Sequence, residues 1–238
     1  MTAKQSQRMT ADEARARHRD LRDQIIEAAL EHVAFDGWSQ KALEMGAKDQ
    51  GLSKADVLRA FPGGPADAAD HFADWSDRRM LSAMLDLDLA AMKVRDRITA
   101  GVRLRLEMNA PYREAMRRLL SFLALPVNAP LAARMTWRTC DRIWRAAGDR
   151  AADFNHYTKR GLLAPVYTST ILYWLSDTSD DFQETWGYLD RRISDVLKIP
   201  VVQAKAKQAL GRLPSPIGFV QRLRQAAGRR RPGIRPVI

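Results

Sequence analysis

The four histidines are the side chains of this sequence best suited to metal binding or acid–base chemistry. They are His18, His32, His71 and His156. None shows the short spacing to a second ligand that metal sites use, and no further ligand pair accompanies Asp153 and His156. The sequence contains no Glu-x-x-His pair, which di-iron helix bundles need, and no glycine-rich phosphate loop. We therefore expect no cofactor, no metal and no catalysis on this chain.

The single cysteine, Cys140, is the remaining candidate nucleophile. It falls between Trp137 and Trp144 on an apolar helix face, which is typical of a buried structural thiol. One cysteine cannot close a disulfide within the chain, and this fits a reducing compartment. The longest apolar-leaning run without charge, residues 161–176, is short for a membrane span. The first twenty residues are charged and lack the apolar stretch of a secretory signal.

A polar and aromatic stretch, residues 148–160 (GDRAADFNHYTKR), has the composition of an interaction site. Helical spacing places Asp153, Tyr157 and Arg160 on one face. An exposed aromatic flanked by charges and followed by arginine is typical of a protein-binding hot spot. The alternative is that Asp153 caps the helix, Tyr157 is half-buried and Arg160 forms a surface ion pair. From these residues alone, the alternative is favoured.

The apolar residues that follow cover a wide helix face. Such a face is buried by neighbours on two sides or lines a cavity. The candidate lipid-lining residues, on this and neighbouring helices, are Leu120, Leu123, Trp137, Trp144, Tyr167, Ile171, Trp174 and Trp186. Plain core packing or a dimer interface is the alternative for each of them.

The positive charge of the chain is concentrated in its last segment. The net charge is +11, and residues 198–238 carry ten basic and no acidic side chains. Within them, residues 215–228 can form an amphipathic basic helix, which favours binding to a membrane surface with anionic lipids. The alternatives are a solvated tail and a helix docked on its own domain. The candidate membrane-binding residues are Ile217, Phe219, Val220, Arg222, Leu223 and Arg224.

Helical periodicity over most of the chain predicts an all-α protein. We expect a flexible N-terminus (1–20), three helices in a helix-turn-helix-like unit (21–75), a helical lipid-binding domain (76–197), and a basic linker with the amphipathic helix (198–238). A separate helix is predicted over 80–91. The other helices of the second domain are expected near 98–108, 111–126, 130–147, 153–176 and 180–197.

The sequence GLSKADVLRAFPGG, residues 51–64, resembles the turn and recognition helix of the TetR family of regulators. The charges argue against DNA reading, because residues 1–75 hold ten basic and thirteen acidic side chains. DNA affinity is built largely on phosphate neutralisation. We therefore expect a retained scaffold without specific DNA binding. A TetR-like regulator with an apolar effector pocket is the alternative function.

The sequence from about Leu21 to the basic tail resembles the ubiquinone-biosynthesis lipid-binding family, the ninth coenzyme-Q protein and its bacterial relatives. The segments that carry the resemblance are LALP (123–126), TWRTCDRIWRAAGD (136–149), ADFNHYTKRGLLAPVYTSTILYWL (152–175) and TWGYLDRRISDVLKI (185–199). The resemblance implies a TetR-like fold, a homodimer, and an isoprenoid quinone or precursor as the bound lipid.

The resemblance also implies a non-catalytic role, in which the protein presents lipid intermediates to the di-iron demethoxyubiquinone hydroxylase. The surface for that enzyme would be Asp153, Phe154, Tyr157 and Arg160, and with the resemblance this interface becomes the favoured interpretation of the stretch. His156 stands where animal members carry tryptophan. The short N-terminus favours a bacterial cytoplasmic protein, peripheral on the inner membrane.

Overall fold

The structure is a computed structural model that describes residues 10–150 and 154–196 of the chain. In these two ranges the chain forms helices, turns and loops and no strand, which confirms the predicted all-α class. The chain divides into two compact units, 1–193 and 194–238, and nearly all described residues belong to the first. The helices are α1 (Ala11–Asp36), α2 (Gln40–Asp49), α3 (Lys54–Ala60), α4 (Gly64–Leu85), α5 (Val94–Met108), η1 (Ala110–Tyr112), α6 (Arg113–Leu123), η2 (Pro126–Asn128), α7 (Ala129–Ala146), α8 (Phe154–Ser176) and η3 (Asp180–Phe182). A further helix covers 183–196.

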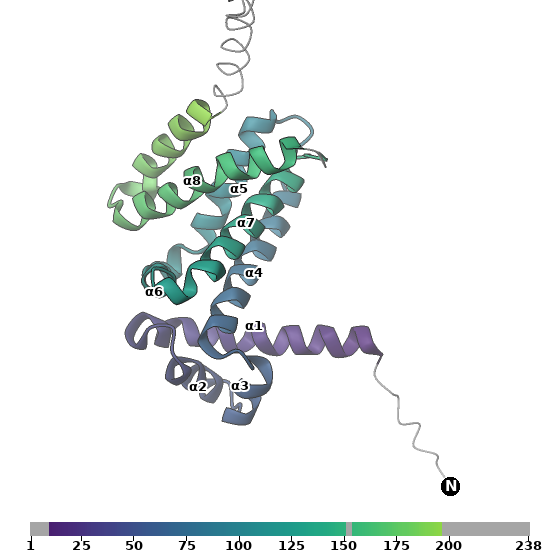
Figure 1. The fold of residues 1–238 in the computed structure, drawn as a ribbon, viewed down its shortest axis with the longest axis vertical. Helices are drawn as coiled ribbons and strands as arrows, with labels where there is room; N and C mark the ends of the chain where they lie inside the picture. Colours follow the sequence, from purple (N-terminus) through teal and green to yellow (C-terminus); the bar gives the residue numbers. More distant parts are fainter. Residues whose placement is uncertain (1–9, 151–153, 197–238) are drawn as a thin grey trace, which may run out of the picture. The chain divides into compact units, whose positions relative to one another are not determined.

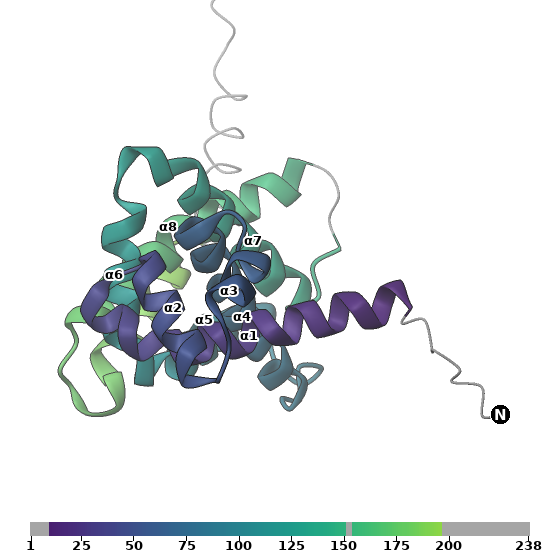
Figure 2. The ribbon, with the colours of Figure 1, turned by 90° about the horizontal axis from the view of Figure 1, so that it is seen from below.

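Two groups of helices make up the first unit (Figure 1). α1, α2 and α3 gather at one end, whereas α5 to α8 pack together at the other. Seen from below, α2 and α3 lie against α1 (Figure 2). α4 joins the groups, because it contacts α1 and α2 as well as α5 and α7. The domain boundary predicted after residue 75 therefore falls inside one continuous helix.

α1 begins at Ala11, so the prediction of a flexible segment through residue 20 is wrong for its second half. Thr10 and Glu13 form a capping box: the Thr10 hydroxyl accepts from the Glu13 amide at 3.2 Å, and the Glu13 carboxylate accepts from the Thr10 amide at 2.7 Å. The first turns of α1 are mostly exposed. The start of this helix is therefore set by the hydrogen bonds of the capping box and not by an apolar stripe.

α1 and α2 approach each other closely at Gly46. A Cβ at this position would lie 2.5 Å from the backbone nitrogen of Ala29, which only a shift of one helix could relieve. We expect Gly46→Ala to lower the free energy of unfolding by about 1–3 kcal/mol, measured by urea denaturation. Gly161→Ala is the matched control, because nothing lies within 4 Å of the added methyl group. Equal stabilities for the two variants would contradict this close approach.

α4 continues to Leu85, so the prediction of a separate helix over 80–91 is wrong. Met80 and Met84 lie on the buried face of α4 together with Phe72, and the apolar periodicity runs on without a break. Turns follow at 86–93 and lead into α5.

Aspartates on α4 face arginines on α7 in an ordered series, which we call the α4–α7 ladder. Asp70 lies 3.1 Å from Arg134 and 2.9 Å from Arg138. Further along, Arg142 lies 2.6 Å from Asp74 and 3.1 Å from Asp77. The ladder consists of Asp70, Asp74, Asp77, Arg134, Arg138 and Arg142. It aligns α7 with α4 and so positions the side chains that α7 contributes to the candidate site.

Asp177 organises the turn between α8 and the helix over 183–196. Its carboxylate accepts hydrogen bonds from the amide and hydroxyl of Thr185, at 2.9 and 2.5 Å, and of Ser179, at 2.8 and 2.7 Å. Burial raises the pKa of Asp177, but these hydrogen bonds outweigh it and lower the pKa to about 2. The carboxylate is therefore more easily ionised in the folded than in the unfolded chain.

This lowered pKa predicts a specific acid sensitivity. The Asp177 contribution to stability is present above the unfolded pKa of about 3.9 and is lost as the pH falls through about 2. We expect the stability of the wild-type protein to fall more steeply between these pH values than that of Asp177→Asn. Urea midpoints across this range measure the difference, and parallel curves would contradict the assignment.

Candidate functional site

A small cavity lies between α6, α7 and α8, with a volume of about 60 Å³. Its apolar lining includes Met116, Leu119, Leu120, Leu123, Met135 and Ile171. Met116 and Leu119 are buried, whereas Leu120 and Leu123 are half-buried and Thr168 is exposed at its edge. The cavity therefore reaches the surface between α6 and α8.

Half of the candidate lipid-lining residues line this cavity, and the other half lie in the core or at the surface. Leu120, Leu123, Tyr167 and Ile171 all line it.

The four tryptophans among the candidate lipid-lining residues do not line this cavity. Trp174 is fully buried in the core, and Trp144 and Trp186 are buried with their indole nitrogens bonded to backbone carbonyls, at 3.1 Å to Lys159 and 2.8 Å to Asp181. These three serve core packing, the alternative that the sequence left open. Trp137 is 36% exposed and lies on the surface of α7.

One end of the cavity is polar. Arg105 is 3% exposed, and its Nε donates to Asp77 at 2.7 Å. The Nη2 of Arg105 donates to the carbonyl of Ala73 at 3.5 Å, while its Nη1 is buried without a hydrogen-bond partner. The guanidinium carbon lies 5.5 Å from the centroid of the Tyr167 ring, and Asp77 also accepts from the Thr139 hydroxyl at 2.9 Å. Sequence periodicity did not single out Arg105 or Asp77.

The pKa values around this polar end fix the charge states. Burial lowers the pKa of Arg105, but interactions with Tyr167 and Asp77 outweigh it and raise the pKa, so that the guanidinium stays charged. Burial raises the pKa of Tyr167 well above its usual value. Burial, and next the charge of Asp77, raises the pKa of Cys140 to about 12. At neutral pH the phenol and the thiol are therefore both protonated, and Cys140 has the environment of a structural thiol.

Three aromatic side chains form a second feature, which we call the aromatic surface: Trp137 of α7 with His156 and Tyr157 of α8. The Trp137 and Tyr157 rings stack with centroids 6.0 Å apart, and the His156 ring lies 5.1 Å from Tyr157. Tyr157 is 62% exposed. Tyr157 is thus the exposed aromatic residue that the sequence predicts, and it stacks on Trp137, one of the candidate lipid-lining residues.

Arg160 does not belong to this exposed surface, because the structure buries the side chain that the sequence predicted to contact a partner. Its side chain is 1% exposed. Nε donates to Asp141 at 2.9 Å, and Nη1 donates to Asp149 at 2.6 Å and to the carbonyl of His156 at 3.1 Å. Arg160 thus links the first turns of α8 to Asp141 of α7 and to Asp149 just after that helix, and it acts as a positioning residue.

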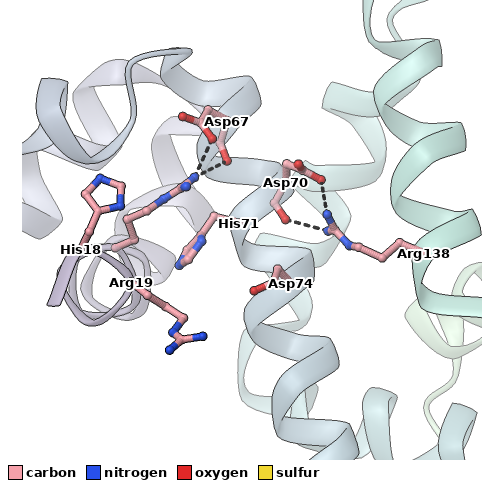
Figure 3. Close-up of a pocket in the computed structure, with 8 residues that line it drawn as sticks. His18, Arg19, Asp67, Asp70, His71, Asp74 and Arg138 are labelled. Atoms are coloured by element: carbon pink, nitrogen blue, oxygen red, sulfur yellow. Dashed lines mark hydrogen bonds and ion pairs between the residues drawn. The ribbon is translucent and has the colours of Figure 1, made fainter. Parts of the chain in front are cut away.

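A charged cleft of about 300 Å³ lies between α1, α4 and α7 (Figure 3). Arg22 lies 2.5 Å from Asp67, and Arg138 bridges from α7 to Asp70. The His71 Nε2 is 2.6 Å from an oxygen of Asp23, and burial together with the charge of Arg22 lowers the pKa of His71. Because its arginines and aspartates neutralise one another, we assign this cleft a structural role in holding α1 to α4.

Several predicted residues lie outside the described residues. They are Asp153, the side chain of Phe154, and the membrane-binding candidates Ile217, Phe219, Val220, Arg222, Leu223 and Arg224. In the described ranges, no three His, Cys, Asp or Glu side chains gather as they would around a metal ion. No single helix there is long and apolar enough to cross a membrane, although the bent pair Ala110–Leu123 and Pro126–Ala146 passes the same test of length and composition together.

The three N-terminal helices, joined through α4 to a bundle of longer helices, define a TetR-like all-α protein. The structure is similar to that of the TetR transcriptional regulator from Nitrosomonas europaea ATCC 19718, with a TM-score of 0.61 at 21% sequence identity. The similarity covers 75% of this chain and 98% of that one. It confirms the predicted TetR-like fold.

The sequence comparisons lead to one family. The COQ9 family model matches residues 129–200. The chain is 34% identical over 186 residues to "Ubiquinone biosynthesis protein COQ9, mitochondrial" of Rattus norvegicus, over 75% of this chain and 59% of that protein. The human protein of the same name is also 34% identical, over 58% of its length, and that of Drosophila melanogaster is 30% identical over 191 residues. The chain is therefore similar in sequence to the COQ9 proteins, which confirms the predicted resemblance.

The chain spans about three fifths of the length of the curated relatives it matches. The segment matched by the family model contains all of α7 and α8 and the helix over 183–196. The aromatic surface, Arg160 with its two carboxylates, and one wall of the cavity therefore lie within the residues that the family model matches.

Proposed function

We propose that this protein is a non-catalytic, lipid-binding accessory protein of ubiquinone biosynthesis. In this proposal it takes isoprenoid quinone intermediates from the membrane and presents them to the di-iron demethoxyubiquinone hydroxylase. The observation that carries the proposal is the homology to proteins named for ubiquinone biosynthesis. The family-model match over the cavity wall and the aromatic surface supports it.

The cavity supports the lipid-binding part of the proposal. Pockets for apolar ligands are lined by hydrophobic side chains with a few placed polar groups, and this one combines leucine and methionine walls with Arg105, Thr139 and Tyr167. Its volume of about 60 Å³ suits part of a ring rather than an isoprenoid chain. The chain of the lipid would therefore leave by the mouth, where α6 and α8 reach the surface.

Membrane association rests on the basic segment 198–238, with its ten cationic side chains. Each basic residue near an anionic membrane surface contributes about 1 kcal/mol. We place the protein, as a homodimer, on the cytoplasmic face of a bacterial inner membrane, whereas the named relatives are mitochondrial.

Mass spectrometry of organic extracts from the purified protein tests this function. The full chain is compared with a version ending at residue 197. A stoichiometric isoprenoid quinone or precursor in both samples would support a lipid site in the folded body. Lipid in the full chain alone would mean adsorption to the basic segment, and no quinone in either sample would refute the proposal.

The aromatic surface provides a test of hydroxylase binding. Tyr157→Ala removes an exposed ring, so we expect unchanged thermal stability and hydroxylase binding weaker by about 30-fold, the effect of losing one hot-spot residue. Binding is measured by titration calorimetry with the purified enzyme. Phe35→Ala is the control, because Phe35 is also an exposed aromatic but lies on α1. Equal affinities for the two variants would remove Tyr157 from the proposed interface.

Transcriptional regulation is the competing function for a TetR-like fold. The cations of the candidate recognition helix α3 argue against it: Lys54 lies 2.7 Å from Glu44, and Arg59 pairs with Asp56. Phosphate binding would have to replace these ion pairs. Salt-dependent gel shifts of the chain ending at residue 197 separate the two functions, because sequence-specific retention of DNA would favour a regulator.

A further inference from the structure

The unpartnered nitrogen of Arg105 is the feature of the cavity that its apolar lining does not explain. Arg105 is almost fully buried, and Nη1 is the one part of its guanidinium whose nitrogen makes no hydrogen bond among the described residues. A buried donor without an acceptor is destabilising, and such donors in native proteins are rare. Since Arg105 lines the cavity, a molecule in the cavity can supply the missing acceptor.

We propose that Arg105 binds an oxygen atom on the ring of the bound lipid, so that the ring enters first and the tail lies toward the surface. The acceptor is a neutral oxygen of the quinone carbonyl, phenol or methoxy type. This inference rests on the proposed lipid-binding function and adds the orientation of the ligand and the group that recognises it.

The charge balance favours a neutral acceptor over a carboxylate. Asp77, which also pairs with Arg142 at 3.1 Å, already lies 2.7 Å from the Nε of Arg105 and compensates its charge at close range. A carboxylate in the cavity would add a second negative charge beside Asp77 in an apolar site, and burying an unpaired charge is strongly unfavourable. A neutral oxygen accepts the Nη1 hydrogen bond without that penalty.

The position of the mouth sets the direction of the tail. Arg105 belongs to α5 and is buried, whereas Leu120, Leu123 and Thr168 line the same cavity where α6 and α8 are partly exposed. A lipid whose ring oxygen contacts Arg105 therefore has its chain between these three side chains.

The experiment compares three small probes that share a ten-carbon saturated tail: a benzoquinone, a benzene and a benzoate. Binding to the purified full chain is followed by tryptophan fluorescence. We expect the benzoquinone to bind about tenfold more tightly than the benzene, which corresponds to one hydrogen bond to a charged group. The benzoate should bind no better than the benzene. Equal affinity for benzoquinone and benzene, or preference for benzoate, overturns the inference.

Infrared spectroscopy of a benzoquinone labelled with ¹³C at its carbonyl carbons supplies a direct signature. Bound to the wild-type protein, one carbonyl band should shift to lower frequency than in hexane. Arg105→Lys keeps a positive charge beside Asp77 but lacks the forked donor. It should remove both the band shift and the preference for the quinone while leaving benzene binding intact. The control is Arg103→Lys on the same helix, whose side chain pairs with Glu107 at 2.7 Å and lines no part of the cavity.

A second variant locates the ligand without touching the buried ion pair. Thr168 is exposed at the mouth, so Thr168→Trp should fold normally and weaken benzoquinone binding at least tenfold by covering the entrance. Unchanged binding would overturn the inference even if Arg105→Lys failed to fold. The two proposals can fail separately. If the purified extracts contain quinone but the carbonyl band of the bound benzoquinone is not shifted, the proposed lipid-binding function stands and the proposed role of Arg105 is refuted.

Discussion

Replacing Asp77 by alanine is expected to lower the free energy of unfolding by about 3–5 kcal/mol, because the charge of Arg105 then stays buried without its partner. Asp77 is fully buried and accepts from Arg105 at 2.7 Å, from Thr139 at 2.9 Å and from Arg142 at 3.1 Å. The loss combines an uncompensated guanidinium on α5 with lost hydrogen bonds from two side chains of α7, Thr139 and Arg142.

Urea denaturation monitored by circular dichroism measures this loss. Asp70→Ala is the matched control on the same helix, since Asp70 and its partners Arg134 and Arg138 are more exposed and each pairing contributes about 1 kcal/mol or less. Adding Arg105→Met to Asp77→Ala should recover part of the stability, because it removes the orphaned charge. A double variant less stable than Asp77→Ala would show that the buried charge is not the source of the loss.

Replacing Arg160 by alanine is expected to have an effect of the same size, about 3–5 kcal/mol, with a melting temperature lower by on the order of 10 °C. Arg160 is the buried cation that pairs with both Asp149 and Asp141. Its removal leaves these carboxylates with the more exposed Lys159 and Arg145 as cationic partners.

Differential scanning calorimetry checks this result against Arg145→Ala. Arg145 pairs with the same Asp141 at 2.7 Å but is 67% exposed, so its loss should change stability by about 1 kcal/mol or less. Arg160→Ala should also weaken hydroxylase binding indirectly, by loosening the helix that presents Tyr157. A variant with normal stability and weak hydroxylase binding would instead return Arg160 to the contact surface.

The helices and their approximate ends could be predicted from the sequence wherever an apolar stripe or a proline marked them. Pro111, Pro126 and Pro130 delimit elements that the structure contains nearly as predicted. The start of α1 was missed because its first turns have no buried face, although the Thr10–Glu13 spacing of a capping box was present. Local hydrogen bonds set that end, whereas the prediction relied on burial.

The candidate site was predicted only where side-chain type alone indicates the environment. Tyr157 is exposed as expected, and Tyr167 and Ile171 line the cavity. The burial of Arg160 depends on Asp141, 19 residues earlier in the chain, and on Asp149, and the polar end of the cavity depends on Asp77 of α4 meeting Arg105 of α5. Such pairings between elements leave no mark in the periodicity of either helix.

The α4–α7 ladder has a property that its individual ion pairs do not show. Its charges recur about once per helical turn on both helices, so a displacement of α7 along α4 by one turn, about 5.4 Å, would bring Arg138 opposite Asp74 and form a new set of pairs. A repeating ladder therefore defines the alignment of two helices only to the nearest turn. Asp77 removes this ambiguity, because Arg105 and Thr139 meet it at one position only. The buried contacts of Asp77 with Arg105 and Thr139 therefore select one alignment of α7 on α4 among those that the repeating charges would allow.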